Sequence, residues 1–140
     1  MSSMLDRVLP SVLSQPLHRA AGLEFLSAAD GHAEIRYEVN ENTCNPLGML
    51  HGGVVCMMHD VADFLAVASL LPAERHAVTA DTQSCMLRPA NRGEKIVVRA
   101  RVDRLGRTLA FIRCESFAVD VDGRERLIAT GAITKAVTTP

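Results

Sequence analysis

The stretch NPLGMLHGGVVCMMHD, residues 45–60, decides the fold. Its first half is typical of a loop because it holds a Pro and a Gly, and its second half is an apolar run that closes on an acid. The run predicts a helix from about Leu50 to Leu71, which Pro72 ends. A helix that is apolar on nearly all sides must be wrapped by a sheet or buried against a partner.

Segments on both sides of this helix alternate between apolar and polar residues, which indicates strands. One strand is expected before the helix, in HAEIRYEV. Four more are expected after it, at residues 76–87, 95–105, 108–119 and 126–137. Consecutive strands joined by short links form an antiparallel sheet. The fold class is therefore α+β, with a sheet around one central helix.

The whole chain, residues 1–140, has the length of one domain. Residues 1–21 form an N-terminal helical segment in this prediction. Its first helix is amphipathic and is expected to be interrupted near Pro10. A second helical turn begins at Pro16 and ends before Gly22.

Composition excludes several classes of protein. A hydrophobic content of 48% argues against disorder, and a net charge of −1 without Trp argues against nucleic acid as a partner. No apolar run approaches the roughly 20 residues of a membrane span, and the N-terminus lacks the pattern of a signal peptide. We therefore expect a cytoplasmic protein with free thiols and no metal site, because none of its cysteines has metal-ligand spacing: Cys44, Cys56, Cys85 and Cys114.

Gly52 and Gly53 stand where the predicted helix begins. The first turn of a helix has unpaired N–H groups and a partial positive charge, so it can polarise a carbonyl oxygen and stabilise an oxyanion. Glycine lets a substrate atom approach the backbone closely. The alternative is a loop-to-helix junction that merely needs glycine torsions.

Asp60 has the apolar neighbours Cys56, Met57 and Phe64 one turn away. A carboxylate in such dry surroundings is costly unless it has a function, which makes Asp60 a candidate general base or nucleophile. The alternative is a carboxylate that pairs with a core Arg or caps buried backbone. Asp63 either disfavours the ionised form of Asp60 by like-charge repulsion or pairs with His59.

The separation of Gly52 and Asp60 has a consequence for assembly. Eight residues of helix span about 12 Å, which an Asp side chain cannot bridge. If both residues act on one carbonyl, Asp60 must therefore come from another chain. Two antiparallel central helices around a twofold axis would make a homodimer with composite sites. We expect these dimers to pair into a tetramer, as a dimer of dimers.

The pattern N-x-x-G-x-x-H-G-G, followed by an acid nine positions after the His, resembles the hotdog-fold thioesterases of the PaaI-like (phenylacetate-pathway) family. The segments TADTQSCMLRPA and GRTLAFIRCE resemble later strands of that family, and the likeness extends from about Gly22 to Val137. It implies an antiparallel sheet wrapped around the helix and an acyl-CoA substrate. One departure is Asp63, where relatives usually have an uncharged residue.

By position, the resemblance assigns the backbone N–H to Gly52, the shaping of the site to His51 and Asn45, and the acid to Asp60. Thr79 falls where relatives often carry a small hydroxyl residue, and could hold water or orient Asp60. His51 could also be a general base. Gly53 and two arginines near turns, Arg88 and Arg107, are candidates for binding the substrate, since CoA carries phosphates.

The function expected is hydrolysis of an aryl or medium-chain acyl-CoA to free acid and CoA, without a cofactor. Asp60 acts either as a base on water or as a nucleophile through an anhydride. Five apolar residues suggest an acyl pocket: Met49, Met57, Met58, Phe64 and Leu65. One rival is a hotdog hydratase or dehydratase for enoyl thioesters. The other is a non-catalytic binder of acyl-CoA or of an acyl carrier protein.

Overall fold

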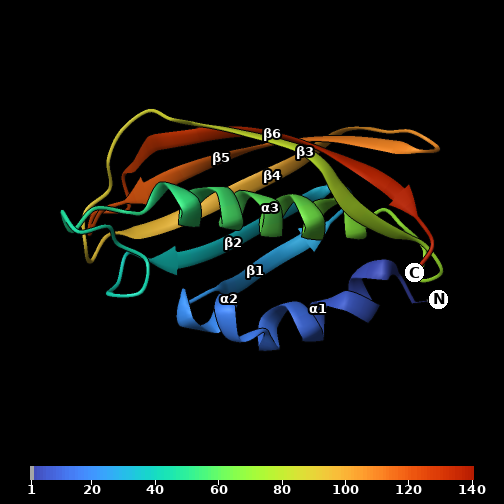
Figure 1. Cartoon of the computed structure of the whole chain (residues 1–140), viewed down its shortest axis with the longest axis horizontal. Coiled ribbons are helices and arrows are strands. Elements are labelled where there is room, and N and C mark those ends of the chain that lie inside the picture. Colours follow the sequence, from blue (N-terminus) through green and yellow to red (C-terminus); the bar gives the residue numbers. More distant parts are fainter. Residues whose placement is uncertain (1) are drawn as a thin grey trace.

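One long helix packs against a six-stranded antiparallel sheet in the computed structural model, which describes residues 2–140 (Figure 1). The strand order across the sheet is β1-β2-β4-β5-β6-β3. This is the α+β layout expected from the sequence. The elements are α1 (Met4–Ser14), α2 (Pro16–Ala20), β1 (Glu24–Ala29), β2 (His32–Glu38), α3 (Gly52–Ala68), β3 (His76–Met86), β4 (Lys95–Leu105), β5 (Leu109–Val119) and β6 (Glu125–Thr138).

The core lies between α3 and the sheet face that it covers. Met58 and Leu65 of α3 are fully buried, together with Ile35 of β2 and Val98 of β4. Alternate residues of β4 and β5 point into this core, because successive side chains of a strand point to opposite faces. The helix and the later strands therefore occupy the positions predicted for them, with α3 slightly shorter at both ends.

The first strand, β1, has no counterpart in the sequence prediction. It pairs with β2 through a hairpin whose two turn residues, Asp30 and Gly31, have φ values of 52° and 81°. Two consecutive positive φ values are typical of a type I′ turn, for which Asp-Gly is a favoured sequence. The dipeptide Asp30–Gly31 was thus the sequence signal for this hairpin, and so for a strand before β2. A register shift between Phe25 and Ser27 obscures the alternation that would have indicated the strand.

The expected interruption near Pro10 is wrong, because α1 continues through this residue to Ser14. Pro10 costs the helix one backbone hydrogen bond. The helix persists because Ser3 and Asp6 form a capping box at its start. Its inner side is also buried against the rest of the molecule, chiefly through Met4 and Val8.

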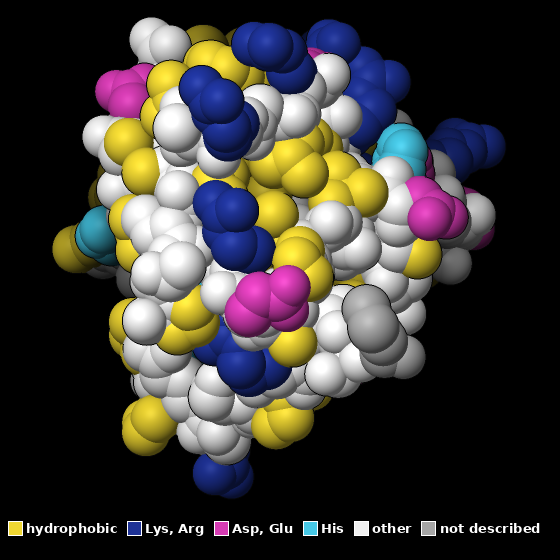
Figure 2. Space-filling view, turned by 90° about the vertical axis from the view of Figure 1, so that its right-hand side faces the viewer, with side chains coloured by type: hydrophobic (Ala, Val, Ile, Leu, Met, Phe, Trp, Pro, Cys, Tyr) yellow, Lys and Arg dark blue, Asp and Glu magenta, His cyan; other side chains and the backbone are white. Residues whose placement is uncertain are grey.

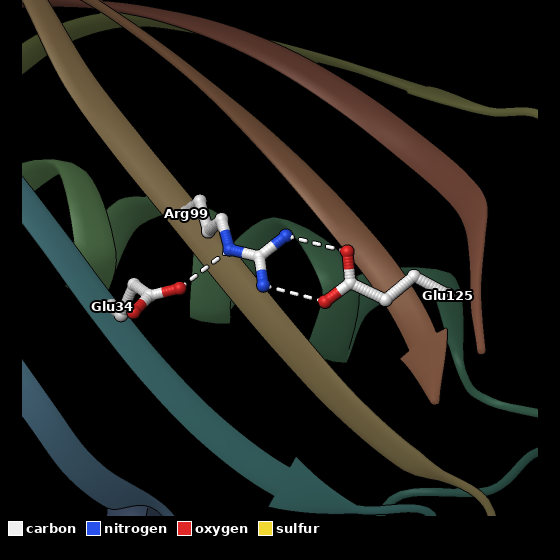
Figure 3. Close-up of polar contacts among 3 residues, drawn as sticks. All are labelled: Glu34, Arg99 and Glu125. Carbon is white, nitrogen blue, oxygen red and sulfur yellow. Dashed lines mark hydrogen bonds and ion pairs between the residues drawn. The ribbon is translucent and has the colours of Figure 1, made fainter. Parts of the chain in front are cut away.

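The opposite face of the sheet is charged. Arg99 of β4 bridges Glu34 of β2 and Glu125 at the start of β6 (Figure 3). All three side chains are more than one-third exposed, so each pair stabilises the fold by at most about 1 kcal/mol. The bridge ties together strands that are not neighbours in the chain.

The edge strand β3 pairs with β6 on one side only. Most of its residues are exposed, including Val78 and Met86, which are 47% and 48% exposed. A long exposed edge strand with apolar side chains is a ready template for another strand. Beside it, α3 leaves a stripe of half-exposed or exposed residues at helical spacing: Gly53, Cys56, Met57, Asp60 and Phe64.

Candidate active site

The loop before α3 is closed by Asn45. Its side-chain Oδ1 accepts hydrogen bonds from the N–H groups of Leu47 and Met49, at 2.9 and 3.1 Å. The N–H of Asn45 in turn donates to the carbonyl of Met49 at 2.7 Å. Asn45 therefore fixes the loop that leads into the helix, as a polar side chain commonly does in a tight turn.

His51 is the N-cap residue of α3. Its Nδ1 accepts a hydrogen bond from the N–H of Gly53 at 2.8 Å, so Nδ1 carries no proton and Nε2 carries the proton of the neutral ring. A Cβ on Gly53 would lie 2.9 Å from the His51 ring, which explains the glycine there. Both the N–H and the bare Cα of Gly53 thus serve the cap.

Gly52 differs from Gly53 in that its N–H has no hydrogen-bond acceptor among residues 2–140. The N–H groups of Val54 and Val55 donate to the carbonyl of His51. Gly52 therefore offers the free amide of the first turn, at the positive end of the helix dipole. It borders a hollow of about 290 Å³ lined also by Met86 and Arg88.

Asp60 does not lie in dry surroundings, contrary to the expectation from its helical neighbours. Its side chain is 47% exposed and lies between α3 and the edge strand β3. Asp60 Oδ1 accepts hydrogen bonds from Thr79 Oγ1 at 2.6 Å and from Lys135 Nζ at 2.9 Å. Of the alternatives for Asp60, a pair with a core cation is present, and the cation is Lys135 rather than an Arg.

Asp63 is the buried carboxyl group of the helix. It is fully buried, and neither oxygen has a hydrogen-bond partner among residues 2–140. Burial raises the pKa of Asp63 to about 8; the nearby charge of Lys135 opposes this rise and that of Asp60 adds to it.

The expected pair of Asp63 with His59 is absent. His59 instead contacts Ser84 Oγ at 2.9 Å and Ser116 Oγ at 2.7 Å, and burial lowers its pKa to about 4. The two hydroxyl groups satisfy both ring nitrogens of a neutral imidazole. Sequence spacing placed His59 and Asp63 on one helix face, but a network across the sheet takes the histidine.

The two arginines chosen from the sequence lie far apart. Arg88 borders the hollow beside Gly52, and its Nη1 donates to the carbonyl of Leu127 at 2.8 Å. Arg107 lies in the β4–β5 turn, at the end of the molecule opposite to the start of α3 (Figure 1). Lys and Arg side chains gather on that end (Figure 2).

The apolar residues proposed for an acyl pocket do not all lie at one place. Met58 and Leu65 are fully buried in the core. Met57 borders a hollow of about 330 Å³ with Leu17 and His51. Two hollows therefore flank the start of α3, one on the side of β3 and one on the side of α2.

Lys135 is the site residue that the sequence analysis missed. It is 1% exposed and contacts both Asp60 and Thr79. The signal was present in the segment AITKAV, where Lys135 alternates with Ile133 and Val137 and so shares the inward face of its strand.

Metal-ligand clusters and membrane-spanning helices are both absent from the described part of the chain. Residues 2–140 contain no group of three or more His, Cys, Asp or Glu side chains placed to hold a metal ion. No helix among them is long and apolar enough to cross a membrane.

The six-stranded antiparallel sheet packed around one long helix fits the hotdog fold. The model of the thioesterase superfamily matches residues 47–123. Acyl-coenzyme A thioesterase 13 of Homo sapiens is 35% identical over 117 residues, which cover 81% of this chain and 78% of that protein.

Solved structures of thioesterase-family proteins are also similar to this chain. A thioesterase family protein of Silicibacter pomeroyi has a TM-score of 0.89 at 29% identity and covers 98% of this chain and 99% of its own. A mutant of the phenylacetic acid degradation protein PaaI of Thermus thermophilus has a TM-score of 0.76 at 29% identity, covering 87% and 98%. The chain belongs to the thioesterase superfamily, in its hotdog-fold, PaaI-like branch, and is a thioesterase.

Proposed function

We propose that the chain hydrolyses acyl-CoA thioesters to free acid and CoA. The observation that carries this proposal is the unpartnered N–H of Gly52 at the start of α3, among residues 2–140. A thioester oxygen placed there is polarised, and the negative charge of the tetrahedral intermediate is stabilised by a donor already in position. Hydrolysis by this route needs no cofactor.

Asp60 supplies the second part of the reaction from the partner chain. Within one chain about 12 Å of helix separates it from Gly52. The edge strand β3 runs from Thr79, beside Asp60, to Met86, beside Gly52. An antiparallel pair of β3 strands around a twofold axis therefore brings each Asp60 toward the partner's helix start.

Asp60 acts on water as a general base or attacks the carbonyl carbon as a nucleophile. In the first case the water gains a bond to the carbonyl carbon while its proton moves to the carboxylate, and CoA leaves as the thiol. In the second case a carboxylate oxygen bonds to the carbonyl carbon, the C–S bond breaks and CoA leaves as the thiolate; water then hydrolyses the anhydride to free acid and restores the Asp60 carboxylate. His51 holds the helix start through its cap, and Asn45 holds the loop before it.

The substrate proposed is an aryl or medium-chain aliphatic ester of CoA. The hollows of about 290 and 330 Å³ beside the helix start have the size of small-molecule pockets. Arg88 lies beside Gly52 of its own chain, and Arg107 lies at the end that the antiparallel pairing turns toward the partner's helix start. Both suit the phosphates of CoA. Pairing of dimers into a tetramer and a cytosolic location belong to the same proposal.

A hydratase is disfavoured by one contact. Such an enzyme needs an acid and a base close together. The Nδ1 of His51 accepts the N–H of Gly53 and the proton of the neutral ring is on Nε2, so neither ring nitrogen is free to act as the base. A non-catalytic binder would have no need of the free amide and the carboxylate together.

The test is a thiol-release assay of the purified protein on a panel of aryl and aliphatic CoA esters. We expect free CoA from at least one ester, and a kcat at least about a hundredfold lower for Asp60→Asn, the scale of lost acid–base catalysis. Asp122→Asn, in the exposed β5–β6 turn, is the control. An enoyl absorbance change without thiol would indicate a hydratase, and no reaction at all would indicate a binder.

A further inference from the structure

Lys135 is a buried cation whose polar contacts lie within the proposed site. It points inward from β6 and is 1% exposed. Its Nζ donates to Asp60 Oδ1 at 2.9 Å and to Thr79 Oγ1 at 2.8 Å, and it lies 5.4 Å from the centre of the Phe64 ring. The charged head of the lysine is thus held between β3 and α3.

The three polar groups form a closed ring of hydrogen bonds. Thr79 Oγ1 lies 2.6 Å from Asp60 Oδ1 and donates to it, since an ionised carboxylate can only accept. A hydroxyl has one hydrogen, so Thr79 accepts the bond from Lys135. This arrangement leaves Thr79 without a hydrogen to donate to water or to an oxyanion.

The ring engages only one oxygen of Asp60. Oδ1 accepts both hydrogen bonds, and Oδ2 has no hydrogen-bond donor among residues 2–140. The side chain of Asp60 is 47% exposed, so the free oxygen has access to the surroundings of the edge strand.

We propose that Lys135 is a positioning residue that anchors Oδ1 of Asp60, so that Oδ2 is the atom that meets the water or the thioester carbonyl. This inference rests on the proposed function. A fixed carboxylate matters because small misplacements of a reacting group cost large factors in rate. Thr79 orients the same oxygen from the other side.

A purely structural ion pair is the competing explanation, and energetics separates the two. Burying a lysine is costly, and removing one member of a buried ion pair destabilises a fold when it leaves the other charge buried and unpaired. The Asp60 side chain is 47% exposed, so without Lys135 its carboxylate is still solvated. Lys135→Met should therefore fold with a Tm close to that of the wild type. The structural explanation predicts a lower Tm and no specific effect on turnover.

The experiment compares wild type, Asp60→Asn, Lys135→Met and the double variant in the thiol-release assay. We expect Lys135→Met to lower kcat by about 10- to 100-fold, with KM near the wild-type value. In the Asp60→Asn background the same change should cause no further loss, because a residue that acts through Asp60 has nothing left to position.

Chemical rescue provides a second measurement. Lys135→Ala leaves a space that propylamine can enter, whereas Lys135→Met fills it. We expect added propylamine to restore part of the kcat of Lys135→Ala and none of that of Lys135→Met. The methionine variant also measures direct attack of the amine on the thioester.

The outcomes separate the two proposals. A folded Lys135→Met with wild-type kcat, or an equal loss in the Asp60→Asn background, overturns the role of Lys135 and leaves the function standing. A wild-type protein that releases no thiol overturns the function itself, and a fully active Asp60→Asn overturns the role of Asp60 and with it that of Lys135. If Lys135→Met does not fold, the propylamine test on Lys135→Ala decides: rescue supports the role and its absence overturns it.

Discussion

Asp63 lies where solvent does not reach its carboxyl oxygens. The groups that face it are the Lys135 ammonium, the Asp60 carboxylate and the Cys114 thiol. Burial dominates over these neighbours and favours the protonated form. At neutral pH the helix therefore carries a neutral acid in its core.

The raised pKa of Asp63 predicts how stability depends on pH. Below about pH 4 the carboxyl is protonated in both folded and unfolded chains, since its ordinary pKa is 3.8. Between about pH 4 and 8 only the folded chain holds the proton, so this group makes the fold less stable as pH rises. Above about pH 8 its contribution levels off. We expect the Tm of Asp63→Asn, relative to that of the wild type, to increase as pH rises across this range.

The measurement is thermal unfolding of both proteins from pH 4 to 9. His59 also titrates in this range, but it is present in both proteins and cancels in the difference. A Tm difference that does not change with pH would show that Asp63 is ionised in the fold.

At this scale the sequence predicted residue types better than their surroundings. The positions of Gly52, His51 and Asn45 at the helix start and in the loop before it could be predicted because they depend on the local chain, and their roles in the reaction stay predictions. Asp60 was expected to be the acid in dry surroundings, but the buried acid of the helix is Asp63. Three residues turn a helix by most of a revolution, and the pattern of an almost wholly apolar helix does not show which face meets the sheet.

The elements α3 and β3 form the face that the dimer proposal uses. The half-exposed stripe of α3 lies beside the unpaired edge of β3, and Cys56 stands midway between Gly52 and Asp60 on that stripe. If each Asp60 meets the partner's Gly52, the twofold axis passes near Cys56. Two copies of Cys56 then face each other across the dimer.

We expect a short bifunctional maleimide to cross-link the Cys85→Ser protein into covalent dimers through Cys56. Cys85 is exposed on β3 and is removed to prevent competing links. The Cys56→Ser/Cys85→Ser protein is the control and should give none. Equal cross-linking of the two proteins would place the axis elsewhere on the molecule.

How well each helix and strand could be predicted depended on how regular its hydrophobic pattern is. Strands β4 and β5 were located within a residue because buried and more exposed residues alternate along most of their length. Strand β6 was located as closely, and alternates in its second half. β1 was missed because it is short and has a bulge, although Asp30–Gly31 indicated its hairpin. The break expected at Pro10 failed because capping and burial outweigh one lost hydrogen bond.

At the scale of the whole molecule, one chain contains both of the groups proposed to react but cannot bring them together. The amide of Gly52 is at one end of α3, and Asp60 is about 12 Å further along it. The edge strand and the helix stripe offer the surface through which a second copy can supply the missing group. This consequence of helix geometry could be derived from sequence alone, whereas the anchoring of Asp60 by Lys135 required the packing of β6 against α3.

A composite site formed by Asp60 and Gly52 of different chains can be tested by mixing two inactive variants. Asp60→Asn and Gly52→Val chains are combined and allowed to exchange, and mass spectrometry measures the mixed dimers. In each mixed dimer one site has both lesions and the other has neither. With random mixing about half of the dimers are mixed, so activity should return to about one quarter of the wild-type value per chain. Mixed dimers that form but stay as inactive as their parents would contradict the composite site.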